Sequence, residues 1–283
     1  MSDVHRASRD RDYWDQARAE VDAWEQGMER GGGIFSKVAN AVMGPVGKAV
    51  ETIIPDKVQE AAGRAVAGVL GKLNDAAAWT VKGESIEKKV AASRSELFDD
   101  LKAADEVARS CWKRGVALGG AEGAATGAAG LPGLVADIPA LLAIALRVVQ
   151  QVGQCYGYDT TSGAEREYVL HVLRTGSTVD SKLKMSFLMI MKELEQVLIK
   201  VGWQKAASGV LGKELARLSL TGGVQQMAKA LGVQLTQRKA LQIVPVVGAV
   251  VGGAFNATFL NDVAKAAFMS YRRRFMRERL EEG

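Results

Sequence analysis

The sequence predicts an all-α protein, a bundle of about eight to ten helices whose central helices are rich in Gly and Ala and closely packed. In the long segments, apolar residues recur at i, i+3, i+4 and i+7, which is the spacing of a helix with one buried face. No segment sustains the alternation of apolar and polar residues that is typical of a strand. With 283 residues, of which 48% are hydrophobic, the chain can bury a sizeable core.

The first expected element is an acidic N-terminal helix in residues 1–30, which three glycines at 31–33 separate from the rest. Its polar composition predicts that it docks loosely or is mobile. Residues 31–283 contain no linker long enough to divide them, so we expect one helical domain there. Within it, Pro55 disfavours helix at the preceding residue, and Asp56 can cap the helix that follows.

Three further helices are expected in chain order. One runs from about Glu84 to Arg114, and the next starts at Ser162, where the sequence has the spacing of a capping box. A third runs over 182–205, with Asp180 as its candidate cap. The buried face of the first helix is predicted from an apolar stripe made of Leu97, Leu101, Ala104, Ala108 and Cys111.

Two apolar segments rich in glycine stand out. In the first, glycines repeat every four residues, and between Gly123 and Leu146 the only charged residue is Asp137. The second, residues 243–256, repeats the same spacing. On a helix, this spacing predicts a bare ridge that another backbone can approach closely. The residues expected to pack in this way are Gly119, Gly123, Gly127, Gly248, Gly252 and Asn256.

Neither segment is a good transmembrane helix, because a span needs about 20 apolar residues. The first contains Asp137 and two prolines, and the second has about 13 apolar residues before Asn256. Pro132 and Gly133 predict a break in the helix, with Asp137 capping a fresh helix after it. Two interpretations stay open: paired helices of a soluble core, or elements that enter or lie on a bilayer.

Positive charge gathers near the C-terminus, where no acidic residue interrupts 270–277. This cluster predicts contact with anionic lipid headgroups, and the alternative is a solvated helix end that complements the helix dipole. No nucleic-acid-binding motif accompanies it, so we expect no nucleic-acid partner. The arginines concerned are Arg272, Arg273, Arg274 and Arg277.

The N-terminus has no apolar stretch of the kind found in a secretory signal, which predicts a cytoplasmic protein. Cys111 and Cys155 are expected to be reduced, small buried side chains.

Several stretches of the sequence resemble the EcsC protein family. They are residues 120–133, 136–139 with Arg147, 156–159, and 244–253 with Asn256. The resemblance covers about residues 34–280 and leaves out the leading helix. It implies a bacterial helical protein with no established reaction, from a family named for a component encoded beside an ABC transporter.

Few residues offer catalytic chemistry. There is no Walker pattern, no Gly-x-Ser-x-Gly and no His-Glu-x-x-His, so we expect neither a cofactor nor a metal. Glu167 and His171 stand four residues apart, a spacing that suits two metal ligands and more commonly a surface hydrogen bond. With Asp137 and Arg147 they are the candidates for catalysis.

These observations favour a non-catalytic protein peripheral to the cytoplasmic face of the membrane. Its partner would be an anionic membrane surface or a membrane protein, and the family resemblance points to an ABC transporter. Two alternatives stay open: a soluble bundle that binds a lipid-like ligand in an apolar pocket, and a hydrolase whose site the sequence does not declare. The sequence does not predict the oligomeric state.

Overall fold

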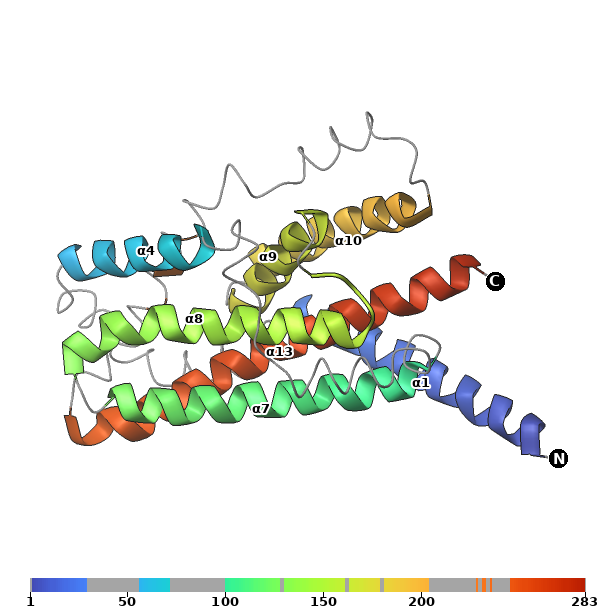
Figure 1. Ribbon diagram of the computed structural model, residues 1–283, viewed down its shortest axis with the longest axis horizontal. Coiled ribbons are helices and arrows are strands. Elements are labelled where there is room, and N and C mark those ends of the chain that lie inside the picture. Colours follow the sequence, from blue (N-terminus) through green and yellow to red (C-terminus); the bar gives the residue numbers. More distant parts are fainter. Residues whose placement is uncertain are drawn as a thin grey trace.

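The computed structural model describes residues 2–29, 56–71, 100–127, 130–160, 163–178, 181–203 and 245–282, and a few single positions between 228 and 235 (Figure 1). Seven helices lie within these ranges, and no strand does. The all-α class is thereby confirmed, and the helices in the described part of the chain are fewer than the eight to ten predicted.

Three long helices form the centre of the molecule: α7 (Leu101–Gly127), α8 (Gly130–Cys155) and α13 (Pro245–Glu282). α7 and α8 run antiparallel, and the 38-residue α13 packs against both (Figure 1). The end of α7 and the beginnings of α8 and α13 therefore meet at one end of the molecule.

α7 begins at Leu101 because Asp100 caps it. The Asp100 side chain accepts hydrogen bonds from the backbone N–H groups of Lys102 and Ala103, at 2.9 and 3.2 Å. The prediction of one helix from about Glu84 to Arg114 is therefore wrong, because no helix passes through Asp100. The predicted stripe is confirmed from Leu101 to Cys111, where its four members are at most 1% exposed; Leu97 lies outside the described residues.

α8 corrects the predicted break at Pro132 and Gly133. The helix runs without interruption from Gly130 to Cys155, with Pro139 inside it. Pro132 falls in the first turn, where proline is tolerated. At Pro139 the loss of one helix hydrogen bond is offset by burial, since Ile138, Leu141 and Leu142 are fully buried. Asp137 therefore stands inside a helix and is not a cap.

Three shorter helices surround the central three. α9 (Gly163–Ser177) packs against α13 and α8, α10 (Ser181–Trp203) packs against α9, and α4 (Asp56–Gly71) packs against α8. α4 begins at Asp56, as predicted. The predicted caps Ser162 and Asp180 lie outside the described residues.

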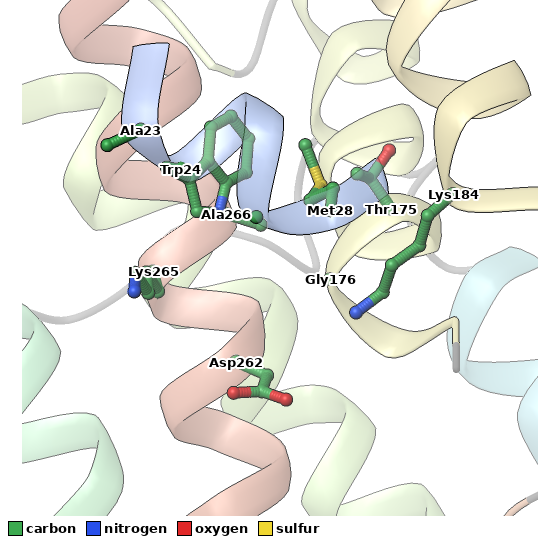
Figure 2. A pocket seen from close by; sticks show the side chains of 10 residues that line it. Ala23, Trp24, Met28, Thr175, Gly176, Lys184, Asp262, Lys265 and Ala266 are labelled. Carbon is green, nitrogen blue, oxygen red and sulfur yellow. The ribbon is translucent and has the colours of Figure 1, made fainter. Parts of the chain in front are cut away.

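The N-terminal helix α1 (Ser2–Glu29) packs against α10 and α13. Among the α1 side chains that the structure describes, from residue 11 to 28, the buried apolar ones are Ala17, Val21 and Met28. Beneath it α9, α10 and α13 complete a cavity of about 120 Å³ (Figure 2). Trp24 of α1 lies on one side of this cavity and Asp262 of α13 on another. The described structure thus shows α1 docked, and its looseness stays a prediction.

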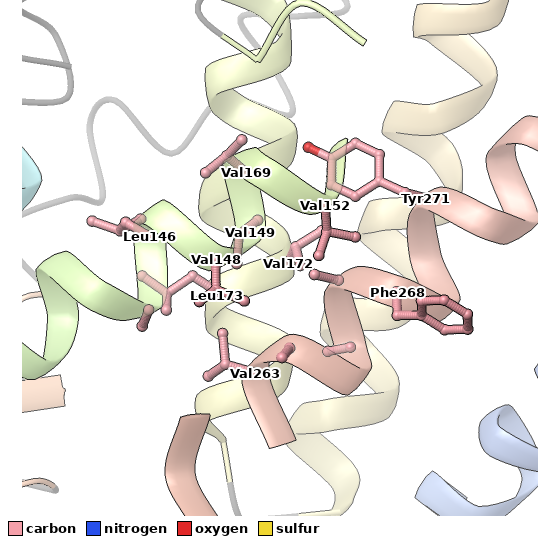
Figure 3. Packing of buried hydrophobic residues seen from close by; sticks show 14 of the residues in the cluster. Leu146, Val148, Val149, Val152, Val169, Val172, Leu173, Val263, Phe268 and Tyr271 are labelled. Carbon is pink, nitrogen blue, oxygen red and sulfur yellow. The ribbon is translucent and has the colours of Figure 1, made fainter. Parts of the chain in front are cut away.

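Part of the apolar core lies where α8, α9 and α13 meet (Figure 3). Valines and leucines of α8 and α9 pack there, and Phe268 and Tyr271 of α13 lie near them. After α8 the chain turns at Gly157, whose φ of 90° lies in the left-handed region that favours glycine. This core fixes the positions of the polar side chains described next.

Candidate functional site

Three consecutive arginines in the C-terminal half of α13 are buried. Arg272, Arg273 and Arg274 are 1%, 7% and 4% exposed. Successive residues on a helix point about 100° apart, so the three side chains leave α13 in three directions. Each one meets carboxylates from other helices.

Arg272 joins α13 to α7 and α1. Its guanidinium lies 2.6 Å from Asp105 of α7 and 2.6 Å from Glu20 of α1. The hydroxyl groups of Tyr13 and Tyr156 each donate a hydrogen bond of 2.6 Å to Asp105. The Asp105 carboxylate, which is 0% exposed, is thus surrounded by a cation and two donors.

Arg273 joins α13 to α10 and α1. It lies 2.6 Å from Glu195 of α10 and 2.7 Å from Glu25 of α1. Arg277, one turn further along, contacts the other oxygen of Glu195 at 3.1 Å, and Lys192 contacts Glu25 at 2.5 Å. Two carboxylates and three cations therefore share one polar cluster.

Arg274 joins α13 to α9. It lies 2.7 Å from Glu165 and 3.0 Å from Glu278, which is on its own helix. The guanidinium also stands 4.0 Å from the ring centre of Tyr158, whose hydroxyl donates to Glu278. We call these three arginines and their carboxylate partners the arginine network.

Within the arginine network, some carboxyl groups have a lowered pKa and others a raised one. Burial raises the pKa of Glu20 and Glu25, but hydrogen bonds and charge from Arg272, Arg273 and Lys192 outweigh it, so both are lowered overall. For Asp105, burial outweighs Arg272 and the pKa is raised. Burial and the hydrogen bond to Asp105 raise the pKa of Tyr13 to about 12.

These contacts correct the predicted role of the arginines. Arg272, Arg273 and Arg274 face carboxylates inside the protein and do not face solvent, where headgroups could reach them. Arg277 is more exposed, at 32% of its side chain, and it also pairs with Glu195. The network ties α1, α7, α9 and α10 to α13, which is a structural role.

We expect the Glu20→Gln, Glu25→Gln double variant to exchange the amide hydrogens of α1 about tenfold faster at neutral pH, because it loses charge-assisted contacts to buried arginines. Hydrogen exchange followed by mass spectrometry measures this. Since folding lowers both pKa values, their stabilisation is complete above the ordinary glutamate range and is lost as pH falls through the lowered values. Variant and wild type should therefore converge only once the pH has fallen below the lowered pKa values of both carboxyl groups.

The control for this variant is Asp15→Asn, because the Asp15 side chain is 77% exposed. Exchange in α1 should match the wild type there. If both variants exchanged alike, the arginine network would not hold α1.

A second polar cluster lies where α7, α8 and α13 gather. The Asn256 amide donates to Glu122 at 2.9 Å and to Asp137 at 3.0 Å. Asn256 and Asp137 are both 0% exposed. A Cβ on Gly123 would lie 2.5 Å from the carbonyl oxygen of Gly252, a separation that no side chain allows. The absence of a side chain at Gly123 is what lets α7 and α13 approach here.

The other glycines named from the sequence have different surroundings. Gly119 faces the side chain of Leu260, which occupies the position that a Cβ would take. Gly127 and Gly248 are helical, but their packing lies outside the described part of the structure. The ridge therefore stays a prediction at those two positions.

The candidate catalytic side chains are not brought together in one site. Asp137 and Arg147 are ten residues apart on α8, about 15 Å along the axis. Asp137 is buried and Arg147 is exposed. On α9, His171 is buried in the core and Glu167 is half-buried. Among the described residues, no group of three or more His, Cys, Asp or Glu side chains could hold a metal ion.

The model of the EcsC protein family matches residues 15–276. The chain belongs to the EcsC protein family. The match begins inside α1 and includes Glu20 and Glu25, so the expectation that the leading helix lies outside the family is wrong for its second half.

Two curated proteins of Bacillus subtilis (strain 168) are similar in sequence to this chain. "Uncharacterized protein YdbA" is 26% identical over 292 residues, covering 99% of this chain and 95% of the relative. "Protein EcsC" is 25% identical over 231 residues, covering 82% of this chain and 86% of the relative. No solved structure matches.

Proposed function

We propose that this EcsC-family protein is non-catalytic and binds the membrane surface by placing an apolar tip in one leaflet of the bilayer. The apolar tip consists of residues 123–136 and 243–255, neither of which contains a charged residue. The helical parts of both segments lie at the same end of the molecule (Figure 1). This gathering of two uncharged segments, far apart in sequence, is the observation that carries the proposal.

The length of the apolar tip fits one leaflet. From Pro245 to Asn256, α13 extends about 16 Å, and from Gly130 to Asp137, α8 extends about 10 Å. Half of a typical hydrocarbon core is about 15 Å thick. The cluster of Glu122, Asp137 and Asn256 then stands near the headgroups, where polar groups cost little.

A peripheral protein agrees better with α8 than a membrane-spanning one does. Within the described residues, one stretch, Asp137–Cys155, is long and apolar enough to cross a membrane. However, 61% of it is buried inside the protein, where it packs against α7 and α13. Exposing it to lipid would break the core, so contact through the tip costs less.

The cavity beneath α1 gives little support to the alternative of a lipid-binding pocket. Sites for drug-sized ligands are about 300–1,000 Å³ and mostly apolar. This cavity is about 120 Å³, and Lys184, Asp262 and Thr175 line it beside the apolar residues (Figure 2). The candidate catalytic side chains lie apart from one another and form no common site. This arrangement supports a non-catalytic role over a hydrolase.

Flotation of the full chain with lipid vesicles tests the proposed function. We expect binding to vesicles of neutral phosphatidylcholine that survives high salt, because the contact is apolar and the main arginines are paired inside the protein. A Leu134→Lys, Val247→Lys variant should bind at least about tenfold more weakly, since each lysine must be buried in hydrocarbon.

The matched control is Met189→Lys on α10, because Met189 is 64% exposed and lies outside the apolar tip. Its binding should equal that of the wild type. Unchanged binding by the tip variant, or complete release by salt, would contradict the proposal. Binding to protein-containing membranes without binding to pure lipid would indicate a membrane protein as the partner, which would contradict it as well.

A further inference from the structure

Two cysteines that are 44 positions apart in sequence meet in the core. The sulfur atoms of Cys111, in the middle of α7, and Cys155, the last residue of α8, are 3.7 Å apart. Both are free thiols and only 1% and 2% exposed, which confirms that they are buried. A shift of less than 2 Å would bring the sulfurs to the distance of a disulfide, about 2.05 Å.

The two thiols differ in acidity. The hydrogen bond from the Cys155 thiol lowers the pKa of Cys111 to about 7, against the effect of burial, and the Arg114 guanidinium 3.9 Å from the sulfur adds to the lowering. The same hydrogen bond and burial raise the pKa of Cys155. Because the Arg114 guanidinium lies beside the Cys111 sulfur, we take Cys111 as the nucleophile of the pair.

We propose that Cys111 and Cys155 are a redox-sensitive pair that forms a reversible disulfide between α7 and α8 on exposure to a peroxide. The Cys111 thiolate attacks one oxygen of hydrogen peroxide, the O–O bond breaks, and hydroxide leaves, so that Cys111 becomes a sulfenic acid. The Cys155 sulfur then attacks the Cys111 sulfur. The S–O bond breaks, and its oxygen leaves as water with the thiol proton. Two electrons pass from the two sulfurs to the peroxide.

The position of the pair determines what the disulfide would do. It would close a loop across the α7–α8 hairpin, next to Tyr156, whose hydroxyl donates to Asp105 of the arginine network. A covalent loop of this length restricts the unfolded chain, so the oxidised protein should be more stable. Because both sulfurs are buried, peroxide reaches them only during local opening, and oxidation should be slower than for an exposed thiol.

Mass spectrometry of the full chain tests the inference. The folded protein is treated with hydrogen peroxide and then with an alkylating reagent under denaturing conditions. We expect loss of two hydrogens, protection of both cysteines from alkylation, and a cross-linked tryptic peptide that dithiothreitol releases. The melting temperature of the oxidised protein should rise by about 5 °C or more and return on reduction.

Single variants assign the two roles. Cys155→Ser should trap a sulfenic acid at Cys111, which dimedone labels, while Cys111→Ser should give no sulfenic acid at Cys155 under the same treatment. If Cys155→Ser fails to fold, the mass change of the wild type still decides whether the disulfide forms. No cross-link in the folded protein, or oxidation of Cys111 only to a sulfinic acid, would overturn the inference.

Discussion

Replacing Arg272 with Met should lower the free energy of unfolding by about 3–5 kcal/mol, because it leaves the Asp105 carboxylate buried without its cation. Burial already raises the pKa of Asp105 with Arg272 present, so the ionised form depends on this contact. Urea denaturation of the full chain, followed by circular dichroism, measures the change.

The control for Arg272 is Arg64→Met on α4. Arg64 is 72% exposed and pairs with Glu60, which is 68% exposed, so its loss should cost less than about 0.5 kcal/mol. Adding Asp105→Leu to Arg272→Met should recover part of the stability, since it removes the stranded charge. Equal losses in Arg272→Met and Arg64→Met would mean that the arginine network does not stabilise the fold.

The Gly123→Ala substitution should destabilise the protein by about 1–3 kcal/mol, although alanine favours a helix by about 1 kcal/mol over glycine. The new methyl group would meet the Gly252 carbonyl of α13, and backbone cannot move aside as a flexible side chain can. The same urea experiment measures this effect.

Gly68→Ala on α4 is the matched control, because no heavy atom lies within 4 Å of its added Cβ. There the helix preference acts alone and should stabilise the protein by about 0.5–1 kcal/mol. The two substitutions are chemically identical and should change stability in opposite directions. A gain at both positions would show that α7 and α13 do not approach closely at Gly123.

The helical class and the buried face of α7 could be predicted because they depend on spacing along the chain. The break predicted at Pro132 could not be decided locally. Pro139 has an intrinsic cost of about 3 kcal/mol in a helix, and burial on neighbouring helices offsets it. Local sequence therefore predicted which segments are helical better than it predicted where a helix is interrupted.

The arginine network could not be predicted from the arginines themselves. Residues 270–277 contain no acid, and most of the carboxylate partners come from α1, α7, α9 and α10. A signal was nevertheless present: Asp105 follows Ala104 of the apolar α7 stripe, and Glu195 follows the buried Leu194. Acidic residues beside a buried stripe indicate buried partners of opposite charge.

The depth of single probes in lipid vesicles tests the central claim most directly. In a Cys111→Ser, Cys155→Ser background checked for native circular dichroism, one cysteine is introduced at Ala249 and, separately, at Leu280. These positions lie on α13, about 46 Å apart. With an environment-sensitive fluorophore attached, we expect a blue shift on vesicles at 249 and none at 280. An aqueous spectrum at 249 with bound vesicles would contradict insertion of the apolar tip.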